Sequence, residues 1–238
     1  VDAADYHTRA MQVMRGEGLG REVYYKAPAY AWFVGQIYRV TGPHVEAIYI
    51  LQMLGGVLTA VLAAALAARA FGMPAGWVAG LCTGLYGPLP YYENQLLIEP
   101  AALTASMGAA YLLCRGPGLG RFGRRAGVGF DLAAGALAGL ALQLRPVNVA
   151  LVVGLAGVVG LVPAARTARL GRLLLLLAPI LLALVPTARH NWIASGRFVP
   201  VSVNGGINFY IGNNPDYDTT VAIRPGLRWE ELTQRFGS

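Results

Sequence analysis

The residues of this chain that could do chemistry are a few charged side chains scattered through a largely apolar sequence. Carboxylates can act as general bases or hold a metal ion, and a lysine and an arginine can bind a phosphate group. Two of the acids stand within the first five residues, and the lysine is the only one in the chain. The set comprises Asp2, Asp5, Lys26, Glu93, Glu99 and Arg145.

The composition predicts that these side chains belong to a membrane protein. Of the 238 residues, 55% are hydrophobic and only 13% are charged, and the mean hydropathy is +0.49. An ordinary soluble domain carries roughly 25% charged residues. The apolar segments are continuous and rich in Leu, Ala, Val and Gly rather than alternating, so we expect an all-α polytopic bundle and not a β-barrel.

The apolar runs predict about six transmembrane helices, since about 20 residues are needed to cross ~30 Å of hydrocarbon. The first and longest carries Gly55 and Gly56 together with several alanines, which favour close helix packing. The second is short and ends in an aromatic, proline-rich corner. The expected spans are 45–68, 75–90, 95–114, 127–144, 149–165 and 173–187.

The distribution of arginine predicts how these helices are oriented. The net charge is +7, and the arginines gather in alternate loops, which by the positive-inside rule face the cytoplasm. This pattern explains the basic balance better than a nucleic-acid partner does. The residues concerned are Arg69, then Arg115, Arg121, Arg124 and Arg125, and then Arg166, Arg169 and Arg172. The acids, Lys26 and Arg145 are therefore expected together on the extracytoplasmic face.

Three regions follow from this topology. Residues 1–44 form an extracytoplasmic first loop with short helices over Asp5–Arg15 and Ala31–Val40, the first of which would lie along the membrane surface. Residues 45–187 form the bundle, and 188–238 form an extracytoplasmic tail at the start of a further region, with turns or a hairpin around 199–215. A chain that opens inside a polar loop is expected to be a piece of a longer protein that has lost an upstream helix.

Several of these residues also have simple structural interpretations. Asp2 and Asp5 could cap a helix, Lys26 could extend toward the interface, and Glu99 before Pro100 could begin a helix. Asp131 is best explained as a cap or as the partner of an arginine. The two cysteines, Cys82 and Cys114, are expected to be small buried residues, because their spacing suits neither a disulfide nor a metal site.

The order of several short motifs resembles the bacterial glycosyltransferase family 39 proteins, members of the GT-C membrane glycosyltransferases. This family also resembles the protein O-mannosyltransferases and the lipid A aminoarabinose transferase. The resemblance covers nearly the whole chain and rests on the order of the motifs and their side of the membrane. The motifs are Asp2-Ala-Ala-Asp5-Tyr6, Lys26-Ala-Pro-Ala-Tyr30, Tyr92-Glu93, Arg145-Pro-Val-Asn148 and Asn204–Asn214.

The resemblance implies a role for each matched residue. The acid of the first loop falls on Asp2, which would be the general base, with Asp5 nearby in place of the family's second acid. Lys26 would hold the phosphate of the donor, and Arg145 would be a second phosphate ligand. The acid of the second loop is matched by Glu93, and Tyr6, Tyr30 and Asn148 are the remaining positions expected to contact substrate.

The resemblance thus implies a sugar transfer from a polyprenyl-phosphate donor to a glycan, lipid or protein acceptor, on the extracytoplasmic face of a bacterial inner membrane. The sequence leaves the use of a divalent metal ion open. A non-enzymatic transporter or flippase is the alternative, because intramembrane charges and Pro/Gly breaks also suit transporters. A transporter would place its charges near the middle of the bilayer and would show repeats, whereas here the charges are expected at one interface.

Overall fold

The chain folds into a set of helices, as its composition predicts. The computed structural model describes residues 2–115, 124–161 and 165–215, and all regular elements in these ranges are helical. The elements are α1 (Asp2–Met14), α2 (Ala29–Thr41), α3 (Val45–Phe71), α4 (Met73–Gly84), α5 (Pro88–Glu93), α6 (Glu99–Arg115), α7 (Arg124–Leu144), the 3-10 turn η1 (Pro146–Asn148), α8 (Val149–Leu161), α9 (Arg166–Ser195) and α10 (Asn204–Gly212).

Three helices in the described ranges are long and apolar enough to cross a membrane, so the prediction of six spans is confirmed only in part. They are α3, α7 over residues 127–144, and α9. The predicted second span is divided, because α4 ends at Gly84 and α5 begins at Pro88 after a glycine. The predicted sixth span is longer than expected, since α9 has 30 residues and continues through Pro179 and Pro186.

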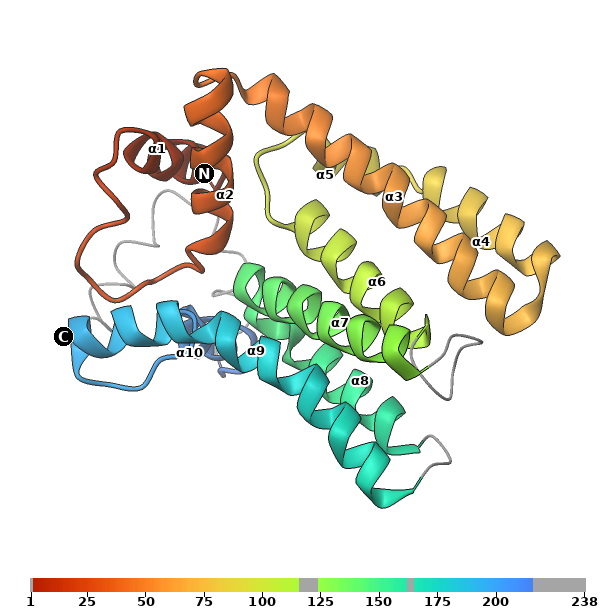
Figure 1. Cartoon of the computed structure of the whole chain (residues 1–238). Coiled ribbons are helices and arrows are strands. Elements are labelled where there is room, and N and C mark those ends of the chain that lie inside the picture. The colour runs from red at the N-terminus through yellow and green to blue at the C-terminus, as the bar shows by residue number, and fades with distance from the viewer. Residues whose placement is uncertain (1, 116–123, 162–164, 216–238) are drawn as a thin grey trace.

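The helices run back and forth between two ends of the molecule (Figure 1). α4 packs on α3, α3 packs on α6, α6 packs on α7, and α7 packs on α9. α1, α2 and α10 lie together at one end, which we call the polar end. The opposite end, where α3 and α6 finish and α9 starts, carries Arg69, Arg115, Arg166, Arg169 and Arg172, so we call it the arginine end.

Small residues let two pairs of helices approach closely, as the glycine- and alanine-rich sequence predicts. A Cβ atom added at Gly76 of α4 would lie 2.6 Å from the Cβ of Ala68 in α3. Likewise a Cβ at Gly135 of α7 would overlap the backbone carbonyl of Leu176 in α9. Any side chain larger than glycine at these positions would therefore separate the helices.

The interface between α7 and α9 also contains the predicted arginine partner of Asp131. Arg172 donates from Nε to Oδ2 and from Nη2 to Oδ1 of Asp131, both at 2.9 Å. The side chains are only 9% and 1% exposed, so this pair is inside the protein. The structural interpretation of Asp131 is thereby confirmed.

The two helices of the first loop pack on each other. The residues Tyr6, Ala10 and Val13 lie on one face of α1 and are buried. This face packs on α2, where a Cβ added at Gly35 would lie 2.6 Å from the Cβ of Val13. The apolar face of α1 therefore has a protein partner within the first loop.

Two further expectations are wrong within the described residues. Within the segment predicted as turns or a hairpin, Asn204–Gly212 forms the helix α10. Cys82 is exposed on α4 and Cys114 is half-buried, so only the second resembles the expected buried residue.

Candidate functional site

A cavity of about 640 Å³ opens at the polar end, and four of the eight predicted site residues line it: Asp2, Tyr6, Lys26 and Arg145. Five segments that are distant in sequence surround it: α1, the Lys26 loop, the start of α6, the end of α7 with η1, and α10 together with Ser202. We call it the polar cavity. Its polar lining consists of Asp2, Tyr6, Lys26, Glu99, Arg145, Ser202, Asn204 and Asn208.

Two acids and two cations of the first loop form an ion-paired cluster, of which Asp2 and Lys26 line the polar cavity, while Asp5 and Arg9 line a neighbouring hollow. Lys26 donates from Nζ to Oδ1 of Asp2 at 2.8 Å and lies 3.2 Å from Oδ2 of Asp5. Arg9 donates from Nε to Oδ1 of Asp5 at 3.0 Å. We call Asp2, Asp5, Arg9 and Lys26 the first-loop cluster. Its position brings together Asp2, Asp5 and Lys26, as the sequence predicts.

The cluster keeps Asp5 and Lys26 charged near neutral pH. Burial raises the pKa of Asp5, but the hydrogen bond and charge of Arg9, with the charge of Lys26, outweigh burial and lower it overall. Burial likewise lowers the pKa of Lys26, whereas the hydrogen bond of Asp2 and the charges of both acids raise it overall. A lysine held by two carboxylates remains a full cation that can exchange one of them for another anion.

A second ion pair lies in the lining of the polar cavity. Arg145, which follows the end of α7, lies with Nη1 at 3.1 Å from Oε1 of Glu99 at the start of α6. The other oxygen of Glu99, Oε2, is buried and accepts no hydrogen bond from the described residues. The sequence assigned Glu99 to a helix start, and the structure shows that it begins α6 and also faces the cavity.

Two tyrosines, Tyr6 and Tyr30, pack next to the first-loop cluster. The ring of Tyr6 meets the ring of Tyr30 edge-on at 4.9 Å between centroids, and Lys26 Nζ lies 5.6 Å from the centroid of Tyr6. Burial, followed by the charge of Asp2, raises the pKa of the Tyr6 hydroxyl far above neutrality. Tyr30 is fully buried and donates to Oε1 of Gln52 in α3 at 2.6 Å, so it supports the site from outside the cavity.

Besides Asp5 and Tyr30, the predicted site residues Asn148 and Glu93 also lie apart from the lining of the cavity. Asn148 donates from Nδ2 to the carbonyl of Ala141 at 2.8 Å and so secures the end of α7. The buried carboxylate of Glu93 lies against Gly56 of α3, where a Cβ would overlap it. Burial raises the pKa of Glu93, and the backbone carbonyl of this residue accepts a hydrogen bond from Gln52 at 2.8 Å.

The end of α9 fixes the loops around the cavity, and sequence reasoning missed this role. Asn191 is fully buried; it donates to the carbonyls of Val199 and Val201 and accepts from the backbone N–H of Tyr24 at 2.9 Å. The ring of His190 stacks on Tyr24 at 4.1 Å. The one signal in the sequence was a His-Asn pair that follows a long apolar run.

An apolar groove of about 300 Å³ lies beside the polar cavity, between α3, α6 and α7. The two hollows share Leu144, and residues of the first turn of α6 line both. Seven of the remaining residues that line the groove are apolar and large: Leu51, Leu58, Leu62, Leu137, Leu140 and Pro100 from the three helices, and Phe33 from α2. The pair of hollows suits a ligand with a polar head and an apolar tail.

The described residues contain no group of three or more His, Cys, Asp or Glu side chains arranged to hold a metal ion. Asp2 and Asp5 instead face Lys26 and Arg9. Comparison of the chain with protein-family models, with curated proteins and with solved structures finds no match. The chemistry of the cavity therefore supplies the argument for function.

Proposed function

We propose that this protein is a membrane glycosyltransferase that moves a sugar from a polyprenyl-phosphate donor to an acceptor glycan, lipid or protein. The observation that carries the proposal is the convergence of Asp2, Lys26 and Arg145 on one polar cavity beside an apolar groove. A lipid-linked phosphate sugar has a matching shape, with an isoprenoid tail for the groove and a charged, hydroxyl-bearing head for the cavity.

The resting ion pairs are suited to an exchange of partners. A phosphate entering the cavity competes with Asp2 for Lys26 and with Glu99 for Arg145, since each cation already faces an oxyanion. The phosphate would then be held by two cations, and Asp2 would be released from its hydrogen bond. The carboxylate of Asp2 would become free to act as a base only when the donor is bound.

Transfer then requires one bond to form and one to break. The acceptor hydroxyl attacks C1 of the sugar, its proton passes to Asp2, and the bond from C1 to the phosphate oxygen breaks. The electron pair of that bond leaves with the phosphate, whose added charge Lys26 and Arg145 neutralise. Asn204 and Asn208 of α10 line the same cavity and supply amide groups for the hydroxyls of the sugar.

In this proposal the polar end faces the extracytoplasmic side of a bacterial inner membrane. The arginine end would face the cytoplasm under the positive-inside rule. Such a placement gives the donor access to the cavity from the outer leaflet. Periplasmic labelling of single cysteines introduced at Thr8 and at Arg166 would test the orientation, because only the first should react with a membrane-impermeant reagent.

The test of function is transfer of radiolabelled sugar from a mixed set of polyprenyl-phosphate sugars, by the full-length protein in membranes. We expect wild type to label an acceptor and Asp2→Asn to lower the rate at least about 100-fold, as for loss of a general base. Glu17→Gln is the matched control, because Glu17 is an exposed acid just beyond α1. Full activity of Asp2→Asn would refute the assigned base, and no donor consumption by folded wild type would favour a transporter or flippase.

A further inference from the structure

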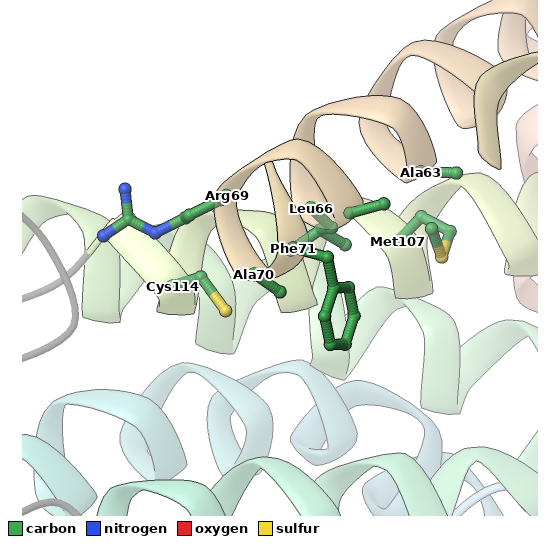
Figure 2. Close-up of a pocket in the computed structure, with 8 residues that line it drawn as sticks. Ala63, Leu66, Arg69, Ala70, Phe71, Met107 and Cys114 are labelled. Carbon is green, nitrogen blue, oxygen red and sulfur yellow. The ribbon is translucent and has the colours of Figure 1, made fainter. Parts of the chain in front are cut away.

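A second groove, of about 560 Å³, lies at the arginine end between the last turns of α3 and α6. Figure 2 shows its side chains, with Met107 and Cys114 contributed by α6 and the others by the end of α3. We call it the arginine-end groove. It is lined by Ala63, Leu66, Ala67, Arg69, Ala70, Phe71, Met107 and Cys114.

The lining of this groove matches a hydrocarbon chain. Alanines at three positions leave a shallow slot, and Leu66 and Met107 provide apolar walls. Phe71 at the end of α3 is 81% exposed, so most of its ring is available to contact a ligand in the groove. Because α3 is long and apolar enough to cross a membrane, the slot would open toward lipid. An acyl chain in the slot would make van der Waals contacts with its apolar lining and leave no void there.

One charged residue gives the groove a preference for anionic ligands. Arg69 lines it and is exposed, and neither an acidic side chain of the lining nor any hydrogen bond to a described residue neutralises it. The buried acid at this end, Asp131, is already held by Arg172. A guanidinium beside a hydrocarbon slot favours a phosphate at the membrane interface, with which it makes charge-assisted hydrogen bonds.

We propose that the arginine-end groove is a binding site for an anionic glycerophospholipid. One acyl chain lies along the alanines of α3, and the headgroup phosphate lies on Arg69. The site is at the opposite end from the polar cavity and does not depend on the function proposed for that cavity. Its physical role is to hold the end of α3 against α6, where the described protein itself leaves a slot.

The test is native mass spectrometry of the full protein released from nanodiscs that contain equal amounts of dioleoyl phosphatidylglycerol and dioleoyl phosphatidylcholine. We expect wild type to retain phosphatidylglycerol preferentially and Arg69→Ala to lower that preference about 10-fold, as for loss of a charge-assisted hydrogen bond. Arg166→Ala is the matched control, because Arg166 is an exposed arginine at the same end outside the groove. It should change the preference less than two-fold.

A second pair of variants tests the slot itself. Ala67→Trp should fill it and lower retention of both lipids, whereas Val78→Trp on the exposed face of α4 should not. Circular dichroism and gel filtration establish that each variant is folded. Equal retention of the two lipids by wild type would overturn the proposal, as would an unchanged preference in folded Arg69→Ala or undiminished retention in folded Ala67→Trp.

Discussion

The first-loop cluster and the pair of Asp131 with Arg172 join the same kinds of charged groups in opposite surroundings. Lys26 binds Asp2 at the edge of a large cavity, and 63% of the Asp2 side chain is exposed. Arg172 binds Asp131 between two packed helices, with the acid only 1% exposed. An ion pair beside a cavity can exchange one partner for a ligand, whereas a pair enclosed by protein can only hold its helices together.

The two kinds of ion pair also join different kinds of segments. The buried pair joins α7 and α9, whose glycines already bring the backbones together. Its two parallel hydrogen bonds fix the lengthwise alignment of these helices. The pairs around the cavity join loops and helix ends, which do not need them for close packing. The enclosed pair and the pairs beside the polar cavity thus lie at opposite ends of the bundle.

The largest expected effect is on the buried pair. Asp131→Asn leaves the buried Arg172 without its counterion, and we expect the free energy of unfolding to fall by about 3–5 kcal/mol. Equilibrium unfolding in mixed micelles measures this change. Replacing both residues by leucine should recover most of the loss, because no buried charge remains.

A double-mutant cycle on Glu99 and Arg145 should show that the coupling energy of this pair differs from that of Asp131 with Arg172. These side chains are 33% and 47% exposed, so their coupling energy should be about 1 kcal/mol or less. A coupling as large as that of Asp131 with Arg172 would mean that the cavity pair is structural. It would then count against an exchange of Arg145 to a phosphate.

An effect between those of the two ion pairs is expected where a buried acid faces glycine instead of a cation. Gly56→Ala would push the Glu93 carboxylate away from α3, and we expect a loss of about 1–3 kcal/mol in the free energy of unfolding. The same unfolding experiment with Gly56→Ala and Glu93→Ala together should recover the loss. Gly157→Ala on α8, where a Cβ meets no other atom within 4 Å, is the control and should not destabilise.

The smallest effect is the pH dependence of the first-loop cluster. The lowered pKa of Asp5 means that its contribution is present above the usual value of 3.8 and is lost as the pH falls through its folded pKa. The raised pKa of Lys26 means that its contribution is present below 10.5 and is lost only as the pH rises through its folded pKa. Between these limits both groups stay charged.

We therefore expect Asp5→Asn to destabilise the protein by about 1 kcal/mol or less, since 31% of the Asp5 side chain is exposed. The difference from wild type should be constant between about pH 5 and 9 and should shrink below about pH 4. Unfolding midpoints across this range measure it. A difference that grows as the pH falls would contradict the assignment of Asp5 as a stabilising carboxylate.

The sequence by itself determined the helical class, the membrane character and the grouping of the catalytic candidates. Continuous apolar runs and a low charge content require helices in lipid, and the arginines mark one end. Asp2, Asp5, Lys26 and Arg145 could be predicted to meet because alternate passes of the chain return them to the same end. For Asp131 the sequence predicted either a helix cap or an arginine partner, and the structure shows the arginine partner, Arg172.

Only the tertiary structure decided which residues face the cavity and which support it. Glu93 and Glu99 are close in sequence, yet the bend between α5 and α6 turns Glu99 toward Arg145 and buries Glu93 against Gly56. Asn191 and the helix α10 escaped prediction because their positions depend on contacts between segments far apart in the chain. Local spacing carries no information on such contacts, since they exist only once the helices have packed.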